Sequence, residues 1–156
     1  MKSDGPLKHL VIAFLIAAAC YALFYPTIEH RRVRKGPWQV TFANNSEGVP
    51  TVTINQPKLA ITNVQLVFPE QAALSNQSQT NFSFRQPQPV PYPVPMGSCL
   101  FMDTTFLPGT VTFQLAGHEI ELLPRVLIID RQEHPWVSGS TITLHPEPVV
   151  PAVGHR

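Results

Sequence analysis

The apolar stretch over residues 10–28 constrains this chain more than any other feature, because it contains no charged residue. As a helix it is about long enough to cross the ~30 Å hydrocarbon core of a bilayer. Beyond Gly36 the pattern of the sequence changes completely. We predict a polar N-terminal tail (1–9), a transmembrane helix (10–28), a basic juxtamembrane linker (29–37), a β-domain (38–145) and a Pro-rich C-terminal tail (146–156).

The same stretch could instead belong to a cleaved signal. Lys2 and Lys8 would form the basic n-region, and the small residues 17–19 would offer a cleavage site, with Cys20 suggesting a lipoprotein signal. Cleavage would leave an apolar stub at residues 21–28, and an alanine stands where a lipoprotein signal needs a larger aliphatic residue. We therefore favour a retained anchor.

Prolines near both ends of the stretch bear on the helix boundaries. Gly5 and Pro6 are expected to prevent an earlier start, and Pro26 is expected close to the helix end near the lipid headgroups.

A basic cluster follows the apolar stretch directly. Its members are Arg31, Arg32, Arg34 and Lys35, and we expect them to contact anionic lipid headgroups at the membrane surface. The positive-inside rule then favours a cytoplasmic β-domain. The periplasmic or extracellular side stays open, because the N-terminal tail also carries lysines.

Charge is distributed unevenly behind the net value of +1. Residues 1–35 hold six Lys/Arg against two Asp/Glu, whereas residues 36–156 hold five against eight. An acidic domain lacks the basic face that nucleic-acid phosphates require, so we expect no nucleic-acid partner. The two cysteines, Cys20 and Cys99, lie in different segments and are not expected to pair.

Beyond Trp38 the apolar residues recur with period two, the pattern of half-buried strands. We expect strands at 38–42, 52–54, 59–68, 82–84, 98–102, 110–115, 119–122, 126–129 and 141–144. The alternation shifts near Asn63, which indicates a bulge or two short strands, and Gly117 predicts a tight hairpin. These short strands and turns predict an all-β fold, a small antiparallel β-sandwich or barrel.

Residues 86–95 alternate proline with other residues. A polyproline ligand is one interpretation, with Pro89, Pro91, Tyr92 and Pro93 as its interaction segment. Prolines two apart do not form P-x-x-P, and in a strand they would all face one edge, where they donate nothing. We therefore favour a Pro-blocked edge strand or rigid connector.

Signals for chemistry are weak. The six histidines show no compact metal-ligand spacing, and no cofactor motif is present, so we expect neither metal nor cofactor. Cys99 has no local base and is expected in a buried strand. An enzyme would need a site of strand-end residues, for which Asp103, His118, Asp130 and His134 are the candidates.

These observations favour a non-enzymatic, single-pass membrane protein. Its β-domain would bind a partner protein as an accessory subunit of a membrane complex. A β-domain that holds a lipid or small molecule between its sheets is the alternative, and the strand-end enzyme site comes third.

Overall fold

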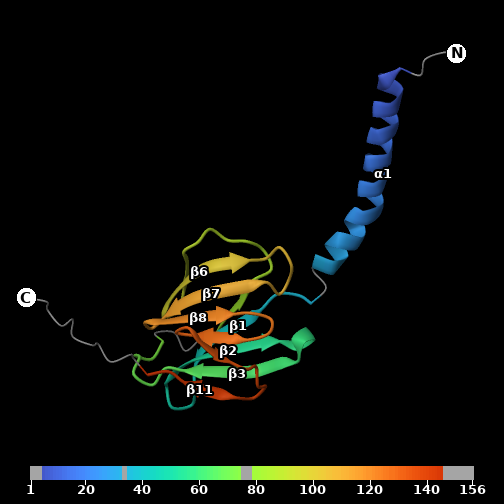
Figure 1. Cartoon of the computed structure of the whole chain (residues 1–156). Coiled ribbons are helices and arrows are strands. Elements are labelled where there is room, and N and C mark those ends of the chain that lie inside the picture. The colour runs from blue at the N-terminus through green and yellow to red at the C-terminus, as the bar shows by residue number, and fades with distance from the viewer. Residues whose placement is uncertain (1–4, 33–34, 75–78, 146–156) are drawn as a thin grey trace, which may run out of the picture. The chain divides into compact units, whose positions relative to one another are not determined.

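The computed structural model describes residues 5–32, 35–74 and 79–145, without the side chains of Glu29, Arg31 and Arg32. The chain divides into a helical unit, Met1–Arg34, and a second unit, Lys35–Arg156, which contains two β-sheets. We call the latter the two-sheet unit. The predicted tail at 146–156 lies outside the described residues. The chain is thus mostly β, with one apolar helix near its N-terminus (Figure 1).

Helix α1 spans Pro6–Arg32 and is longer than the predicted helix at both ends. Pro6 occupies its first position, where a missing N–H costs nothing, so Gly5 and Pro6 do not delay the start. Pro26 lies inside the helix rather than at its end, and the helix continues through the first part of the predicted linker. The segment from Pro6 to Ile28 is long and apolar enough to cross a membrane.

Sheet A contains five strands in the order β11-β3-β2-β1-β4. Their bounds are β1 Gln39–Asn44, β2 Pro50–Gln56, β3 Ile61–Val67, β4 Thr80–Ser83 and β11 Thr141–Thr143. The expectation of a purely antiparallel fold is wrong here, because β11 pairs parallel with β3. A parallel neighbour needs a long connection, and β11 reaches β3 only after the chain has crossed the other sheet.

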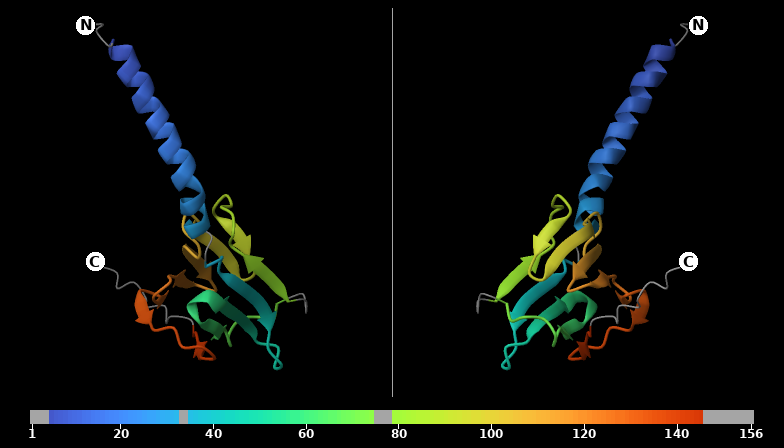
Figure 2. Two further views of the ribbon diagram at one scale, coloured as in Figure 1. Left: turned by 90° about the vertical axis from the view of Figure 1, so that its right-hand side faces the viewer. Right: turned by 90° about the vertical axis from the view of Figure 1, so that its left-hand side faces the viewer.

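Sheet B contains six strands in the order β10-β9-β8-β7-β6-β5, all antiparallel. Their bounds are β5 Tyr92–Val94, β6 Gly97–Asp103, β7 Thr110–Leu115, β8 His118–Leu122, β9 Leu127–Ile129 and β10 Gln132–His134. The β7–β8 hairpin turns at Ala116 and Gly117, both at positive φ, as Gly117 predicted. Figure 2 shows the strands of the two-sheet unit from two further sides.

Both sheets contribute apolar side chains to one core. Phe42 of sheet A lies edge-on to Phe113 of sheet B, with ring centroids 6.5 Å apart, and Phe84 lies 5.5 Å from Phe113. Trp38 is fully buried, and its ring lies 5.3 Å from that of Trp136 at a tilt of 31°. Its Nε1 donates to the Gly109 carbonyl. Burying an aromatic side chain contributes about 1.5–3 kcal/mol, so these rings stabilise the unit strongly.

The 3₁₀ turn η1, Pro57–Leu59, precedes β3, and the predicted irregularity near Asn63 lies beyond it. Ile54 pairs with Val64, whereas Gln56 pairs with Ile61, so the register shifts between them, and Asn63 has a φ of 53°. The bulge expected near Asn63 is therefore confirmed.

A buried amide holds the start of the two-sheet unit. Gln56 is 1% exposed, and its Nε2 donates to the carbonyls of Gly36 and Pro37 at 2.9 and 3.0 Å. Its Oε1 accepts from the Lys58 N–H at 3.1 Å. All polar atoms of this amide are thereby paired, which a buried side chain requires.

The proline-rich segment divides into two parts. Only Tyr92–Val94 forms a strand, β5, which is the edge strand of sheet B, as favoured for this segment. Residues 86–91 form no strand, so this part agrees with the connector alternative and not with an edge strand. The Gln88 N–H donates to Met102 Sδ at 3.2 Å, which anchors the connector beside β6.

Candidate functional site

Among the titratable residues considered for chemistry, Cys99 is the most deeply buried and His118 comes next. His118 begins β8, whose inward positions also hold Ile120 and Leu122, because side chains alternate between the faces of a strand. The His118 side chain is only 7% exposed, and its ring lies 6.3 Å from that of Phe68. Burial of an imidazole requires a hydrogen-bond partner, which comes from outside β8.

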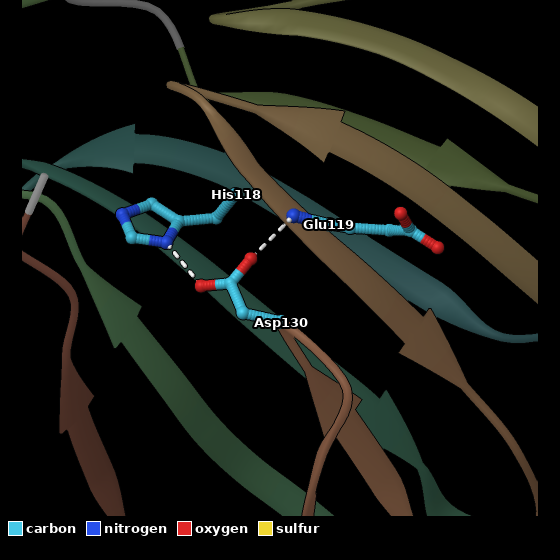
Figure 3. Close-up of polar contacts among 3 residues, drawn as sticks. All are labelled: His118, Glu119 and Asp130. Carbon is cyan, nitrogen blue, oxygen red and sulfur yellow. Dashed lines mark hydrogen bonds and ion pairs between the residues drawn. The ribbon is translucent and has the colours of Figure 1, made fainter. Parts of the chain in front are cut away.

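That partner is Asp130, in the turn between β9 and β10. Its Oδ2 lies 2.6 Å from His118 Nδ1, and its Oδ1 accepts from the Glu119 N–H at 2.9 Å (Figure 3). The Asp130 N–H in turn donates to the Glu119 carbonyl at 2.8 Å. Asp130 and Arg131 both have positive φ, as a two-residue hairpin turn requires. The carboxylate therefore joins this turn to the start of β8.

A carboxylate on Nδ1 is also the arrangement that orients a histidine for proton transfer or metal binding through Nε2. Figure 3 shows the other ring nitrogen of His118 directed away from Asp130. A polar depression of about 420 Å³ lies beside Asp130, but His118 is not among its lining residues. They are Gln114, Gly117, Glu119, Asp130 and Arg131. The imidazole faces the core instead of this depression. The contact between His118 and Asp130 therefore has a structural role.

The strand-end candidates are only partly brought together. His118 and Asp130 meet, whereas among the described residues no hydrogen bond or ion pair joins Asp103 or His134 to them. Asp103 instead accepts from the Thr105 N–H at 2.8 Å, and this contact lowers the pKa of its carboxyl. His134, in β10, pairs with Leu127 of β9. Within the described ranges, no group of three His, Cys, Asp or Glu side chains could hold a metal ion.

Cys99 is fully buried in β6, as expected for a strand cysteine. Its thiol donates to the Phe101 carbonyl at 3.3 Å. Burial raises the pKa of the Cys99 thiol to about 11. A thiol of this kind is a poor nucleophile at neutral pH.

The remaining predicted site residues lie at two places. In the basic cluster, Lys35 is exposed, Arg31 and Arg32 belong to α1, and Arg34 is outside the described residues. In the proline segment, Pro89, Pro91 and Pro93 are exposed. Tyr92 is half-buried, with its ring 6.0 Å from that of Phe82.

The sequence analysis missed the contact between His118 and Asp130, although a signal for it exists. Strand β9 pairs antiparallel with β8, with Ile129 opposite Ile120. Continuing that register by one residue places Asp130 opposite Glu119, beside His118. Pairing the two predicted strands at 119–122 and 126–129 would have located it.

No protein-family model, curated protein sequence or solved structure matches this chain.

Proposed function

We propose that this chain is a single-pass membrane protein whose two-sheet unit, a β-sandwich, binds a partner protein beside the membrane as an accessory subunit. The anchor is α1, whose side chains from Pro6 to Ile28 are exposed along their length. An apolar helix with no covering protein surface is suited to lipid. A cleaved signal would leave the two-sheet unit unanchored, so retention of α1 is part of the proposal.

A bulge in β6 carries the proposal of a protein partner. Cys99 pairs with Phe113 and Phe101 pairs with Thr112, so Leu100 is an extra residue opposite the same partner strand. The insertion reverses the alternation: Phe101 joins Thr112 on the outward face, and Met102 packs against the core instead. Leu100 and Phe101 are therefore 42% and 52% exposed next to each other.

We infer that the proline connector extends this apolar surface. Gln88 is anchored to Met102, and Tyr92 pairs with Cys99, so the residues between them run beside β6. Val90 is 46% exposed there. We call Pro89, Val90, Pro91, Leu100 and Phe101 the β6 patch. Exposed apolar patches with aromatic residues are typical of protein contact surfaces, and a fixed proline connector loses little entropy on binding.

Site-specific photocrosslinking in membranes tests this proposal. A photoreactive phenylalanine analogue at position 101 should give one discrete protein adduct, which the second substitution Val90→Asp should abolish. The matched control places the analogue at Glu121, in the same row of the same face, since Phe101, Thr112 and Glu121 lie opposite one another on β6, β7 and β8. Equal adducts from both positions, or none from position 101, would contradict the proposal.

The side of the membrane is a separate part of the proposal. The basic cluster favours a cytoplasmic two-sheet unit. Reporter fusions to the C-terminus, one active only in the cytoplasm and one only outside it, check this directly. Activity of the external reporter alone would reverse the orientation without affecting the β6 patch.

The filling of the core favours a protein contact over a lipid held between the sheets. The core contains Trp38, Phe42, Phe68 and Phe113, all at most 1% exposed. Two depressions lined by described residues lie on the outward faces of the sheets, one beside Glu119 and Asp130 and one beside Gln39 and Asn81. Close packing of large side chains leaves little room for an internal ligand.

A further inference from the structure

The outward face of sheet A is unusual because none of the outward positions of its described strands carries a charge. The β-register assigns these positions alternately, with Val40, Phe42, Ile54 and Leu66 directed inward. The outward residues are Gln39, Thr41, Ala43, Thr51, Thr53, Asn55, Gln65, Val67, Asn81, Ser83, Thr141 and Thr143.

Sheet B provides the contrast within the same unit. Its outward face carries the carboxylates of Asp103, Glu119, Glu121 and Glu133. Charged side chains are the ordinary occupants of a solvated sheet face. Amides and hydroxyls without charge on one face alone therefore indicate a surface suited to a particular ligand chemistry.

A depression of about 340 Å³ lies on this charge-free face, over β2, β1 and β4. Its lining residues are Gln39, Thr41, Asn55, Asn81, Phe82 and Ser83. The register aligns Asn55, Gln39 and Ser83 in one row across the three strands, with Thr41 opposite Asn81 in the next outward row. The volume falls at the lower end of the roughly 300–1,000 Å³ typical of small-ligand sites.

Neighbouring contacts orient several of these polar groups. Asn81 Oδ1 accepts from the Thr41 hydroxyl at 2.6 Å, and Asn55 Oδ1 accepts from the Asn63 N–H at 2.7 Å. Each amide thus presents its NH₂ group as a donor. The side chains of Gln39 and Ser83 make no hydrogen bond with any other described residue. Phe82 lies between Asn81 and Ser83 in β4, and its ring is directed inward, where it packs against those of Phe42 and Tyr92 at 5.4 and 6.0 Å.

We propose that this depression binds a neutral carbohydrate, one end of an oligosaccharide. Amides and hydroxyls both donate and accept, which matches the hydroxyl groups of a sugar. The absence of charge removes the attraction that would select a phosphate, a nucleic acid or an ionic peptide. The site lies on sheet A, opposite the β6 patch. The carbohydrate proposal is therefore independent of the proposed protein contact.

Saturation-transfer NMR on the full chain, in a detergent without a sugar headgroup, tests the assignment. The probes are maltohexaose, cellohexaose and chitohexaose at millimolar concentration. At least one of them should receive saturation from the protein. Gln39→Ala should weaken its binding about tenfold, the loss expected for one or two hydrogen bonds. Asn81→Ala should do the same.

The matched control is Gln114→Ala, the same residue type on the outward face of sheet B, which should leave binding unchanged. The side chain of Gln39 makes no hydrogen bond with any other described residue, so its variant should remain folded. Absence of saturation transfer to all three probes, or binding that Gln39→Ala does not weaken, overturns the proposal. A change in self-association with Gln39→Ala, measured by sedimentation without sugar, would overturn it in favour of a second copy on this face.

Discussion

His118 Nδ1 and Asp130 Oδ2 lie 2.6 Å apart, and through this contact the β9–β10 turn is joined to the start of β8. The same carboxylate also accepts the Glu119 N–H, so one side chain satisfies two donors. Because the imidazole is buried, removal of its partner leaves a polar group without compensation.

Asp130→Ala should therefore lower the free energy of unfolding by about 2 kcal/mol, in the range of hydrogen bonds to charged groups. Asp130→Asn should retain most of the stability, because its carbonyl oxygen still accepts from the Glu119 N–H and its NH₂ can donate to His118 Nδ1 in the other neutral tautomer. Asparagine also tolerates the positive φ of this position. Urea unfolding followed by the fluorescence of Trp38 and Trp136 measures both. Equal losses for the two variants would show that the pairing of His118 contributes nothing.

Gly97 begins β6 where the backbone of β7 lies close to it. A Cβ added there would lie 1.9 Å from the Gln114 carbonyl oxygen, a backbone atom that cannot move aside. Gly97→Ala should destabilise the two-sheet unit by about 3 kcal/mol or more, among the larger effects of single substitutions. Gly48→Ala is the matched control: it has positive φ but open space, so a loss of only about 1 kcal/mol is expected. The same fluorescence assay compares them.

Cys99 predicts a loss of stability at alkaline pH. The pKa of its thiol is raised to about 11 in the folded chain from an ordinary 9.0. Below pH 9 the thiol is neutral in both states and its contribution is fully present. Between pH 9 and pH 11 the unfolded chain loses the proton first, so stability falls by up to about 2–3 kcal/mol.

Unfolding curves at pH 8 and pH 11 measure this loss, with Cys99→Ala as the control. Cys99→Ala leaves a cavity that lowers the free energy of unfolding equally at every pH. It should lack the part of the alkaline loss of stability that comes from ionisation of the thiol. An identical difference between the two pH values in variant and parent would refute the effect.

Gln56 predicts a local effect on the start of the two-sheet unit. Gln56→Leu removes the two bonds to Gly36 and Pro37 and leaves their carbonyls unpaired, so we expect a loss of about 1–3 kcal/mol. Trypsin should also cleave faster after Lys35. Gln65→Ala, on the outward face of sheet A, should change neither the free energy of unfolding nor the rate of cleavage after Lys35 by a measurable amount. Unchanged cleavage after Lys35 in Gln56→Leu would contradict this role of the amide.

Sequence alone predicted the features that depend on local order. An uncharged apolar stretch at residues 10–28 predicts a membrane-length helix, and period-two alternation predicts the strands, because burial of one face leaves a repeat along the chain. The Gly117 hairpin and the bulge at Asn63 follow from the same local rules.

Only the tertiary structure decided which strands pair and what meets across them. The parallel pairing of β11 with β3 joins strands that are far apart in the chain. The reversal at Phe101 and the contact between His118 and Asp130 depend on the exact register between consecutive strands. A shift of one residue in register exchanges the two faces of a strand, and that register is set by partners distant in sequence. For this reason the sequence predicts a membrane helix and strands, whereas the β6 patch and the charge-free face emerge only when the sheets are assembled.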